Sequence, residues 1–153
     1  MTEISSLADL RRVYAQPSEL ALRKELDHID RHSRAFIARA PFVLIATADA
    51  QGWPDVSPRG DAPGFVAVVD DKRLHLPDRP GNNRLDSFQN LLGNAKIALL
   101  FVVPGRLETL RVNGTARLLR IPSCWRGMPS PASRRAPSSR SPPPASTSSV
   151  ARR

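Results

Sequence analysis

The stretch Phe42-Val43-Leu44-Ile45-Ala46-Thr47-Ala48 is a continuous apolar run of strand length near the middle of the 153-residue chain. The next four residues, Asp49-Ala50-Gln51-Gly52, have the composition of a tight turn. We therefore expect a buried strand that enters a hairpin, with residues 53–56 as the returning strand. Pro and Gly residues at positions 58–64 then interrupt the ladder, and an apolar segment at residues 65–69 resumes it.

The rest of the chain extends this sheet. A helical apolar period spans residues 18–40, and a further strand is predicted at residues 73–76, which completes a four-strand meander. A short helix is predicted at residues 85–92, and two more strands at residues 96–103 and 108–119. This order favours a mainly β fold with flanking helices, a small antiparallel barrel. Its last strand would fall in the following tail, where the sequence does not provide one.

The composition changes abruptly at Pro122. Residues 122–153 hold nine Ser, seven Pro, six Arg and no acidic residue, whereas residues 1–121 carry all 14 acids and 17 of the 23 Lys and Arg. The body is therefore only +3 (17 − 14), and the tail supplies the other +6 of the net charge of +9. A segment of this composition is expected to be disordered. We divide the chain into an N-terminal extension (1–18), one domain (19–121) and the basic tail.

Two interpretations of the tail remain open. A basic tail attracts nucleic acid or anionic lipid, but its one aromatic residue, Trp125, is little support for nucleic-acid binding. Alternatively, a change of reading frame produced the tail. With GC-rich codons, the offset frame after Ile121 reads Glu-Leu-Leu-Ala-Arg-His-Ala, which is an amphipathic helical phrase. We favour the frame change, and the nucleotides around the Ile121 codon would test it.

The sequence also bears on the cellular location of the protein and on metal or disulfide sites. No apolar stretch approaches the roughly 20 residues that cross a bilayer, and the N-terminus does not resemble a secretory signal. We therefore expect a cytoplasmic protein without a membrane partner. The single cysteine, Cys124, excludes a disulfide framework and a Cys-based metal site. His28 and His32 are four residues apart but lack the Glu of the zinc-protease pattern, so we expect a solvated helix face and no metal.

Three polar clusters are candidate binding sites. The first is Pro77-Asp78-Arg79-Pro80-Gly81-Asn82-Asn83-Arg84, at a predicted helix start. Unpaired N–H groups and the positive end of the helix dipole suit an anion such as phosphate there. Plain capping of the helix by Asn82 or Asn83 is an equally good interpretation.

The second cluster is Ser57-Pro58-Arg59-Gly60-Asp61, which meets a polar ligand at a strand edge or forms a bulge in which Arg59 pairs with Asp61. The third cluster, residues 108–114, places alternate polar side chains on one strand face, towards solvent or a ligand. No cluster joins a nucleophile to a base or pairs catalytic carboxylates. We assign no catalytic residue, and a bound cofactor would have to bring the chemistry.

The motifs at residues 55–61, 77–84, 101–105 and 110–114, taken in this order, resemble the pyridoxamine 5'-phosphate oxidase-like flavoproteins. The resemblance is greatest to a bacterial branch of FMN-dependent enzymes with SPRGD and PDRPGNNR motifs, and it covers about residues 20–121. It implies an FMN-binding split β-barrel, here incomplete at its C-terminal end, and a homodimer with FMN between the subunits.

The resemblance also assigns residues to FMN. The expected cofactor-binding residues are Ser57, Arg59, Pro77, Asp78, Asn82, Asn83, Arg84, Thr109 and Arg111. The first two would border the flavin and its ribityl-phosphate arm, and the next two would lie along the cofactor. The two Asn and Arg84 would hold the phosphate, whereas Thr109 and Arg111 would reach the flavin ring from the other side.

The implied function is that of an FMN-dependent oxidoreductase with a small-molecule substrate or a nicotinamide reductant. The substrate does not follow, because one fold hosts many reactions. A non-enzymatic module that holds flavin or haem is the alternative, and nucleic-acid binding through the tail is the least supported interpretation. Because the tail replaces the family's C-terminal part, we expect weak retention of FMN.

Overall fold

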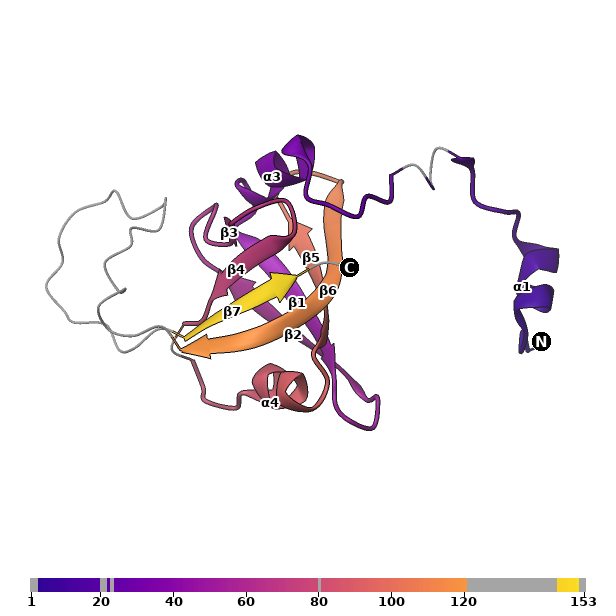
Figure 1. Cartoon of the computed structure of the whole chain (residues 1–153). Coiled ribbons are helices and arrows are strands. Elements are labelled where there is room, and N and C mark those ends of the chain that lie inside the picture. Colours follow the sequence, from indigo (N-terminus) through magenta and orange to yellow (C-terminus); the bar gives the residue numbers. More distant parts are fainter. Residues whose placement is uncertain (1–2, 20–21, 23, 80, 121–145, 152–153) are drawn as a thin grey trace, which may run out of the picture.

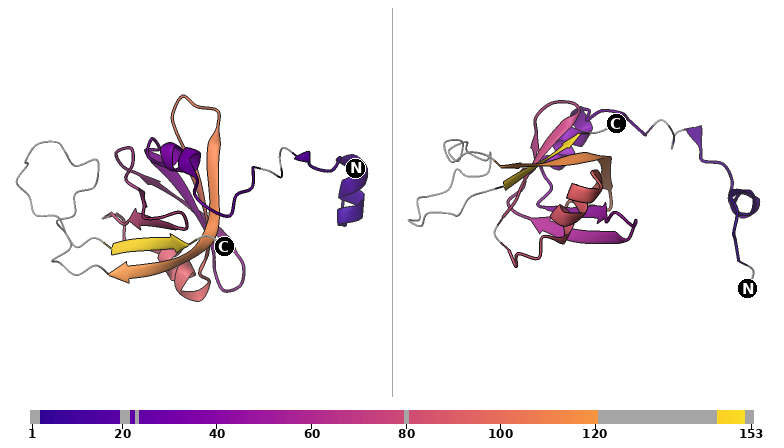
Figure 2. Two further views of the ribbon diagram at one scale, coloured as in Figure 1. Left: turned by 45° about the horizontal axis from the view of Figure 1, so that its top comes forward. Right: turned by 60° about the horizontal axis from the view of Figure 1, so that its bottom comes forward.

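The computed structural model describes residues 3–19, 22, 24–79, 81–120 and 146–151. These residues form a curled, seven-stranded antiparallel sheet with strand order β2-β1-β5-β6-β7-β4-β3 (Figures 1 and 2). The strands are β1 (Phe42–Ala48), β2 (Pro54–Gly60), β3 (Ala67–Val68), β4 (Arg73–Pro77), β5 (Lys96–Val102), β6 (Thr109–Arg120) and β7 (Ser146–Ala151). Within the described residues, β2 and β3 are the two edges of the sheet, so the sheet does not close. The predicted fold class, mainly β with flanking helices and an incomplete barrel, is confirmed.

The helices lie outside the sheet. They are α1 (Leu7–Val13), α3 (Arg31–Ile37) and α4 (Asp86–Gly93). In Figure 1, α3 and α4 lie at opposite ends of the curled sheet, and α1, in the N-terminal extension, stands away from it without a buried residue. Among the helices of the described residues, none is long and apolar enough to span a bilayer.

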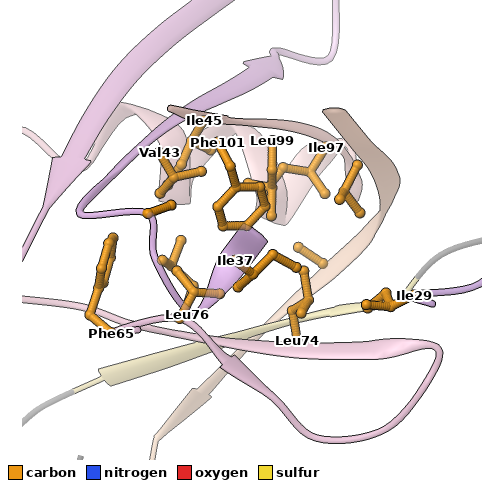
Figure 3. Close-up of a cluster of buried hydrophobic side chains, with 14 of the residues drawn as sticks. Ile29, Ile37, Val43, Ile45, Phe65, Leu74, Leu76, Ile97, Leu99 and Phe101 are labelled. Atoms are coloured by element: carbon orange, nitrogen blue, oxygen red, sulfur yellow. The ribbon is translucent and has the colours of Figure 1, made fainter. Parts of the chain in front are cut away.

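The core fills the inside of the curled sheet. Alternate residues of β1 and β5 point inward, so Val43 lies opposite Phe101 and Ile45 opposite Leu99, all of them buried (Figure 3). Further buried side chains come from β4, β6, both flanking helices and the connecting segments. They include Ile29, Ile37, Phe65, Val66, Leu74, Leu76, Leu91 and Val112. The predicted bounds of β1 are confirmed, because its apolar run fills this core.

Strand β2 differs from the expectation. It continues through Ser57, Pro58 and Arg59 to Gly60, so the predicted interruption of the ladder at Pro58 is wrong. Pro58 is tolerated because β2 is an edge strand, where a residue without an N–H need not break the ladder. The four-strand meander is also wrong, because β2 and β3 occupy opposite edges of the sheet.

The predicted helix over residues 18–40 is also interrupted. Helix α3 begins only at Arg31, and the Asp30 carboxylate caps it by accepting the Ser33 N–H at 2.7 Å. The preceding Ile29 is buried, and its N–H donates to the Asp71 carbonyl at 2.7 Å. These contacts hold the chain before α3 against the β3–β4 turn, a long-range tie that local periodicity does not reveal.

Part of the predicted disordered tail is a strand. Residues 121–145, with Cys124 and Trp125, lie outside the described residues, but Ser146–Ala151 pair as β7 between β6 and β4. The expectation that the tail provides no strand is therefore wrong for these six residues. Pairing on both sides satisfies the backbone N–H and C=O groups of β7. Such backbone hydrogen bonds do not depend on an apolar side-chain pattern.

Candidate functional site

The free edge of β2 borders a cavity of about 680 Å³, which we call the edge cavity. Six consecutive residues of β2, Asp55 to Gly60, form one wall, and Phe65 together with residues 77–79 and 81–87 forms the rest. The structure thus brings together seven of the nine predicted cofactor-binding residues. They are Ser57, Arg59, Pro77, Asp78, Asn82, Asn83 and Arg84.

Helix α4 holds the loop of the edge cavity beside β2. The Asn90 side-chain amide donates to the Thr47 hydroxyl at 3.0 Å, and the Ser87 hydroxyl lies 3.4 Å from an Asp55 carboxylate oxygen. Thr47 and Ser87 are buried, and hydrogen bonds are stronger in such a low-dielectric environment. These two polar contacts therefore stabilise the packing of α4 on the β1–β2 hairpin. The start of α4, and the loop before it, are therefore fixed against the β1–β2 hairpin.

The loop itself has an unusual backbone. Asn83 and Leu85 both have φ of 59°, in the left-handed region, which costs energy for a residue such as Leu. The Asn82 side chain accepts the Arg84 N–H at 3.1 Å, whereas Leu85 occupies the N-cap of α4 without a side-chain bond. The alternative in which Asn82 or Asn83 caps the helix is therefore wrong.

Among the described residues, three guanidinium groups line the edge cavity, and their partners differ. Two nitrogens of Arg79 lie 2.7 and 2.8 Å from one Asp61 oxygen, and Arg84 Nε lies 2.9 Å from Asp86. Arg59 instead donates to the Ser57 hydroxyl and to the Pro58 carbonyl at 3.0 Å. Within the described residues, Arg59 is thus the cavity guanidinium that contacts no carboxylate, and the predicted alternative pairing of Arg59 with Asp61 is wrong.

The Asp61–Arg79 ion pair joins the end of β2 to the loop after β4. Burial alone would raise the pKa of the Asp61 carboxyl, but the Ala62 N–H at 2.7 Å and the Arg79 guanidinium hold the pKa below its usual range. Because both oxygens of the carboxylate are engaged, Asp61 is a fixed anchor for Arg79. This pair therefore fixes one wall of the edge cavity relative to the other.

The last two predicted residues lie elsewhere. Thr109 and Arg111 of β6 border a second cavity of about 550 Å³ on the outer face of the sheet, which we call the face cavity. Its other lining residues are apolar, namely Leu44, Ala46, Val56, Ala98, Leu99 and Leu100. The predicted alternation is confirmed, since Thr109, Arg111 and Asn113 are exposed while Val112 is buried. Val56 borders both cavities.

Sequence reasoning missed several residues of the edge cavity. Asp86, which pairs with Arg84, stands in the first turn of α4, a position where acids are common. Asp55 lies in the motif at residues 55–61, two residues before Ser57, but was not assigned to the site. Phe65 reaches the cavity through the tertiary fold and has no local signal in the sequence. No group of three metal-ligating side chains occurs in the part of the chain that the structure describes.

The chain was compared with known proteins. A family model described as pyridoxamine 5'-phosphate oxidase matches residues 29–151. No curated protein is similar enough in sequence to match. Among solved structures, a candidate pyridoxamine 5'-phosphate oxidase from Lactobacillus delbrueckii superposes with a TM-score of 0.62 at 18% identity, over 85% of this chain and 94% of that one.

Two further solved structures show the same fold. HupZ from Group A Streptococcus has a TM-score of 0.55 at 20% identity, over 82% of this chain and 90% of that one. An F420 reductase has a TM-score of 0.54 at 16% identity, over 78% and 92%. The family match covers most of the chain, including the residues of both cavities, so this chain belongs to the pyridoxamine 5'-phosphate oxidase family.

Proposed function

We propose that this chain is a cytoplasmic FMN-dependent oxidoreductase that binds FMN in the edge cavity. The observation that carries the proposal is the gathering of seven predicted FMN-binding residues around one cavity. In the part of the chain that the structure describes, the Arg59 guanidinium bonds to the Ser57 hydroxyl and the Pro58 carbonyl and to no carboxylate. Family membership supports the same cofactor. The substrate class is a small molecule, with a nicotinamide reductant as the expected partner.

The residues present fit a phosphorylated flavin. A cavity of about 680 Å³ lies in the usual range of roughly 300–1,000 Å³ for ligand sites. Arg59 supplies an available positive charge, and the amides of Asn82 and Asn83 supply neutral donors beside it. Arg84 is 74% exposed, so its ion pair with Asp86 is weak enough to yield to a phosphate.

The face cavity supports a homodimer. Leu44 of β1 lies opposite Leu100 of β5, which lies opposite Arg111 of β6, so one apolar row ends in a cation. Thr109 and Arg111 line this cavity and not the edge cavity of their own chain. A second copy packed on this face would bring its own Thr109 and Arg111 towards the flavin ring, as the family resemblance implies.

Bound FMN would supply the electron and hydride transfer. In this proposal the chain's own residues bind and orient: Arg59 and the loop amides hold the phosphate, and the Asp61–Arg79 ion pair keeps the two cavity walls in place. An F420 reductase among the solved neighbours has the same fold, which supports reductive chemistry as the candidate activity.

A carrier or sensor that holds flavin or haem is the second candidate. It is favoured by the polar groups of the edge cavity, which in the described residues do not pair a nucleophile with a base. Such a protein would bind its cofactor without turning over a substrate. The two candidates therefore share the binding site and differ in the reaction that follows.

The test begins with the full chain, purified in the presence of FMN and freed of unbound flavin. We expect a flavin absorption band that bleaches anaerobically with NADPH or NADH and returns with an electron acceptor. Bound flavin that neither nucleotide reduces would support the carrier. Failure to bind FMN would overturn the proposal for this chain, and a second chain with the offset frame restored after Ile121 would show whether the tail is the cause.

A further inference from the structure

The hydrogen bonds at the two ends of the β1–β2 ladder show which residues of β2 face its free edge. The Asp49 N–H donates to the Trp53 carbonyl at 3.0 Å, and the Asp61 N–H donates to the Pro41 carbonyl at 3.1 Å. Both pairs continue the register in which Ile45 lies opposite Ser57. Hydrogen-bonded pairs alternate in an antiparallel ladder, so the odd-numbered residues of β2 bond to β1. The even-numbered residues point their backbone groups away from it.

This parity gives the prolines of β2 a definite position. Pro54 and Pro58 are both even-numbered, so the N–H that each lacks would have pointed to the free edge. Val56, midway between them, keeps its N–H and points it outward. Between residues 54 and 58, the free edge therefore offers one backbone donor.

The pattern disfavours pairing with another strand. A strand added to this edge would find two of three outward positions without a donor, which is how natural edges avoid unwanted pairing. A small ligand needs only one donor at a defined place. The edge is thus suited to a ligand and unsuited to an added strand or to a second copy joined through β2.

The edge cavity lies along this edge. It is lined by every residue of β2 from Asp55 to Gly60, so residues of both faces of this strand border it. Because β2 is an edge strand of the sheet, the backbone between these two faces is also exposed to a ligand in the cavity. Within the described residues, the Val56 N–H forms no hydrogen bond outside the β1–β2 ladder.

We propose that the Val56 N–H donates a hydrogen bond to the ring of the flavin bound in the edge cavity. This inference rests on the proposed function. Val56 also borders the apolar face cavity, so this part of the site suits the ring, whereas Arg59 and Asn83 suit the phosphate. The acceptor is a carbonyl oxygen or an unprotonated nitrogen of the ring, which FMN and riboflavin share.

The test substitutes proline, which removes the donor at a position where the edge tolerates it. Pro54 and Pro58 already occupy equivalent positions, so we expect Val56→Pro to fold with an unchanged far-UV circular dichroism spectrum. Its affinity for both FMN and riboflavin should fall about tenfold, the loss of one hydrogen bond. Val56→Ala trims the side chain and keeps the N–H, and its affinity should fall about threefold at most.

Equal affinity of wild type and Val56→Pro for both flavins would overturn the inference and leave the proposed function intact. Wild type that binds neither flavin would overturn the proposed function itself. If the proline variant does not fold, amide hydrogen exchange in the wild-type protein decides. Added FMN should slow the exchange of the Val56 amide, and an unchanged rate would refute the hydrogen bond.

Discussion

The two cavities meet at Val56 but are built from different parts of the sheet. The edge cavity is lined by consecutive residues of β2 and by the loop before α4, and its side chains are mostly polar. The face cavity is lined by apolar residues, with Thr109 and Arg111 at its border. The apolar residues are Leu44 and Ala46 of β1, Ala98, Leu99 and Leu100 of β5, and Val56 of β2. A strand edge offers backbone and side chains to a polar ligand, whereas a sheet face offers one flat apolar layer to another protein surface.

The charges of the two cavities differ as well. Three Arg of the edge cavity are balanced by three Asp, at positions 55, 78 and 86, whereas among the described residues Arg111 is the one charged residue that lines the face cavity. Asp61, just outside the edge cavity, engages Arg79 in addition. Arg79 and Arg84 are thus each paired with an acid, and Arg59 is the cavity guanidinium to which we assign the ligand in the proposed function.

The largest effect is expected at the face cavity. Leu44→Asp would bury a charge in the proposed dimer interface, which costs several kcal/mol, so the dimer should dissociate with a dissociation constant raised at least about a hundredfold. Sedimentation velocity over a concentration range measures this. Leu92→Asp, at a residue 79% exposed on α4, is the control and should remain dimeric. A Leu44→Asp variant that dimerises like wild type would remove the face cavity from the interface.

Arg59→Ala tests the edge cavity. Loss of a charge-assisted hydrogen bond to phosphate should weaken FMN binding about 10- to 100-fold and leave riboflavin binding nearly unchanged. Fluorescence titration with both flavins measures the two affinities. Arg73→Ala is the matched control, because Arg73 is exposed and pairs with Asp70 outside the cavity lining. Equal losses for both flavins would contradict a phosphate role for Arg59.

A smaller effect is expected from the Asp61–Arg79 ion pair. Asp61→Asn should weaken FMN binding about three- to tenfold, because a partly exposed ion pair contributes modestly to loop position. The reversed pair, Asp61→Arg with Arg79→Asp, should recover part of the affinity. If the reversed variant folds but recovers no FMN affinity, the charge pair does not position the loop.

The same pair predicts a pH dependence. The pKa of Asp61 is lowered in the folded protein, so its contribution to stability is complete above the ordinary value of 3.8 and is lost as the pH falls through the lowered folded value. Thermal unfolding from pH 6 to pH 3 should therefore show a smaller acid loss in Asp61→Asn than in wild type. If wild type and Asp61→Asn lose the same stability between pH 6 and pH 3, Asp61 is not the source of this pH dependence.

The smallest effect is expected at Asp27, which lines neither cavity. Hydrogen bonds from His28 and Lys72, with the charge of Lys72, lower the pKa of Asp27 to about 2. The Asp27 side chain is 79% exposed, so Asp27→Asn should lower the unfolding midpoint by about 2 °C or less and leave FMN affinity unchanged. A change in FMN affinity would show that the segment before α3 influences the edge cavity.

Local patterns predicted much of this molecule. The apolar run of β1 lies in adjacent residues, so its strand could be predicted from the sequence. The motif at residues 77–84 is also continuous in the sequence, so its place in the candidate site could be predicted too. The path of β2 through Pro58 did not, because the cost of a proline depends on whether the strand lies at an edge. The partner of Arg59 was also missed, since Asp61 turns to Arg79, 18 residues away.

The separation of Thr109 and Arg111 from the other predicted residues has a similar cause. Motifs place residues along the chain, whereas the face of the sheet on which they lie depends on strand order and register. The tail shows the reverse case. The composition of the tail did not indicate a strand. Residues 146–151 nevertheless form β7, because β6 and β4 both pair with their backbone.

Titration of the purified wild-type chain with FMN, followed by flavin fluorescence, tests the central claim most directly. The claim predicts saturable binding of one FMN per chain, at least about tenfold tighter than riboflavin because the edge cavity holds the phosphate. Binding of FMN and riboflavin with equal affinity would contradict the assignment of Arg59 and the loop amides. No saturable binding of either flavin would contradict the claim that the edge cavity is a flavin site.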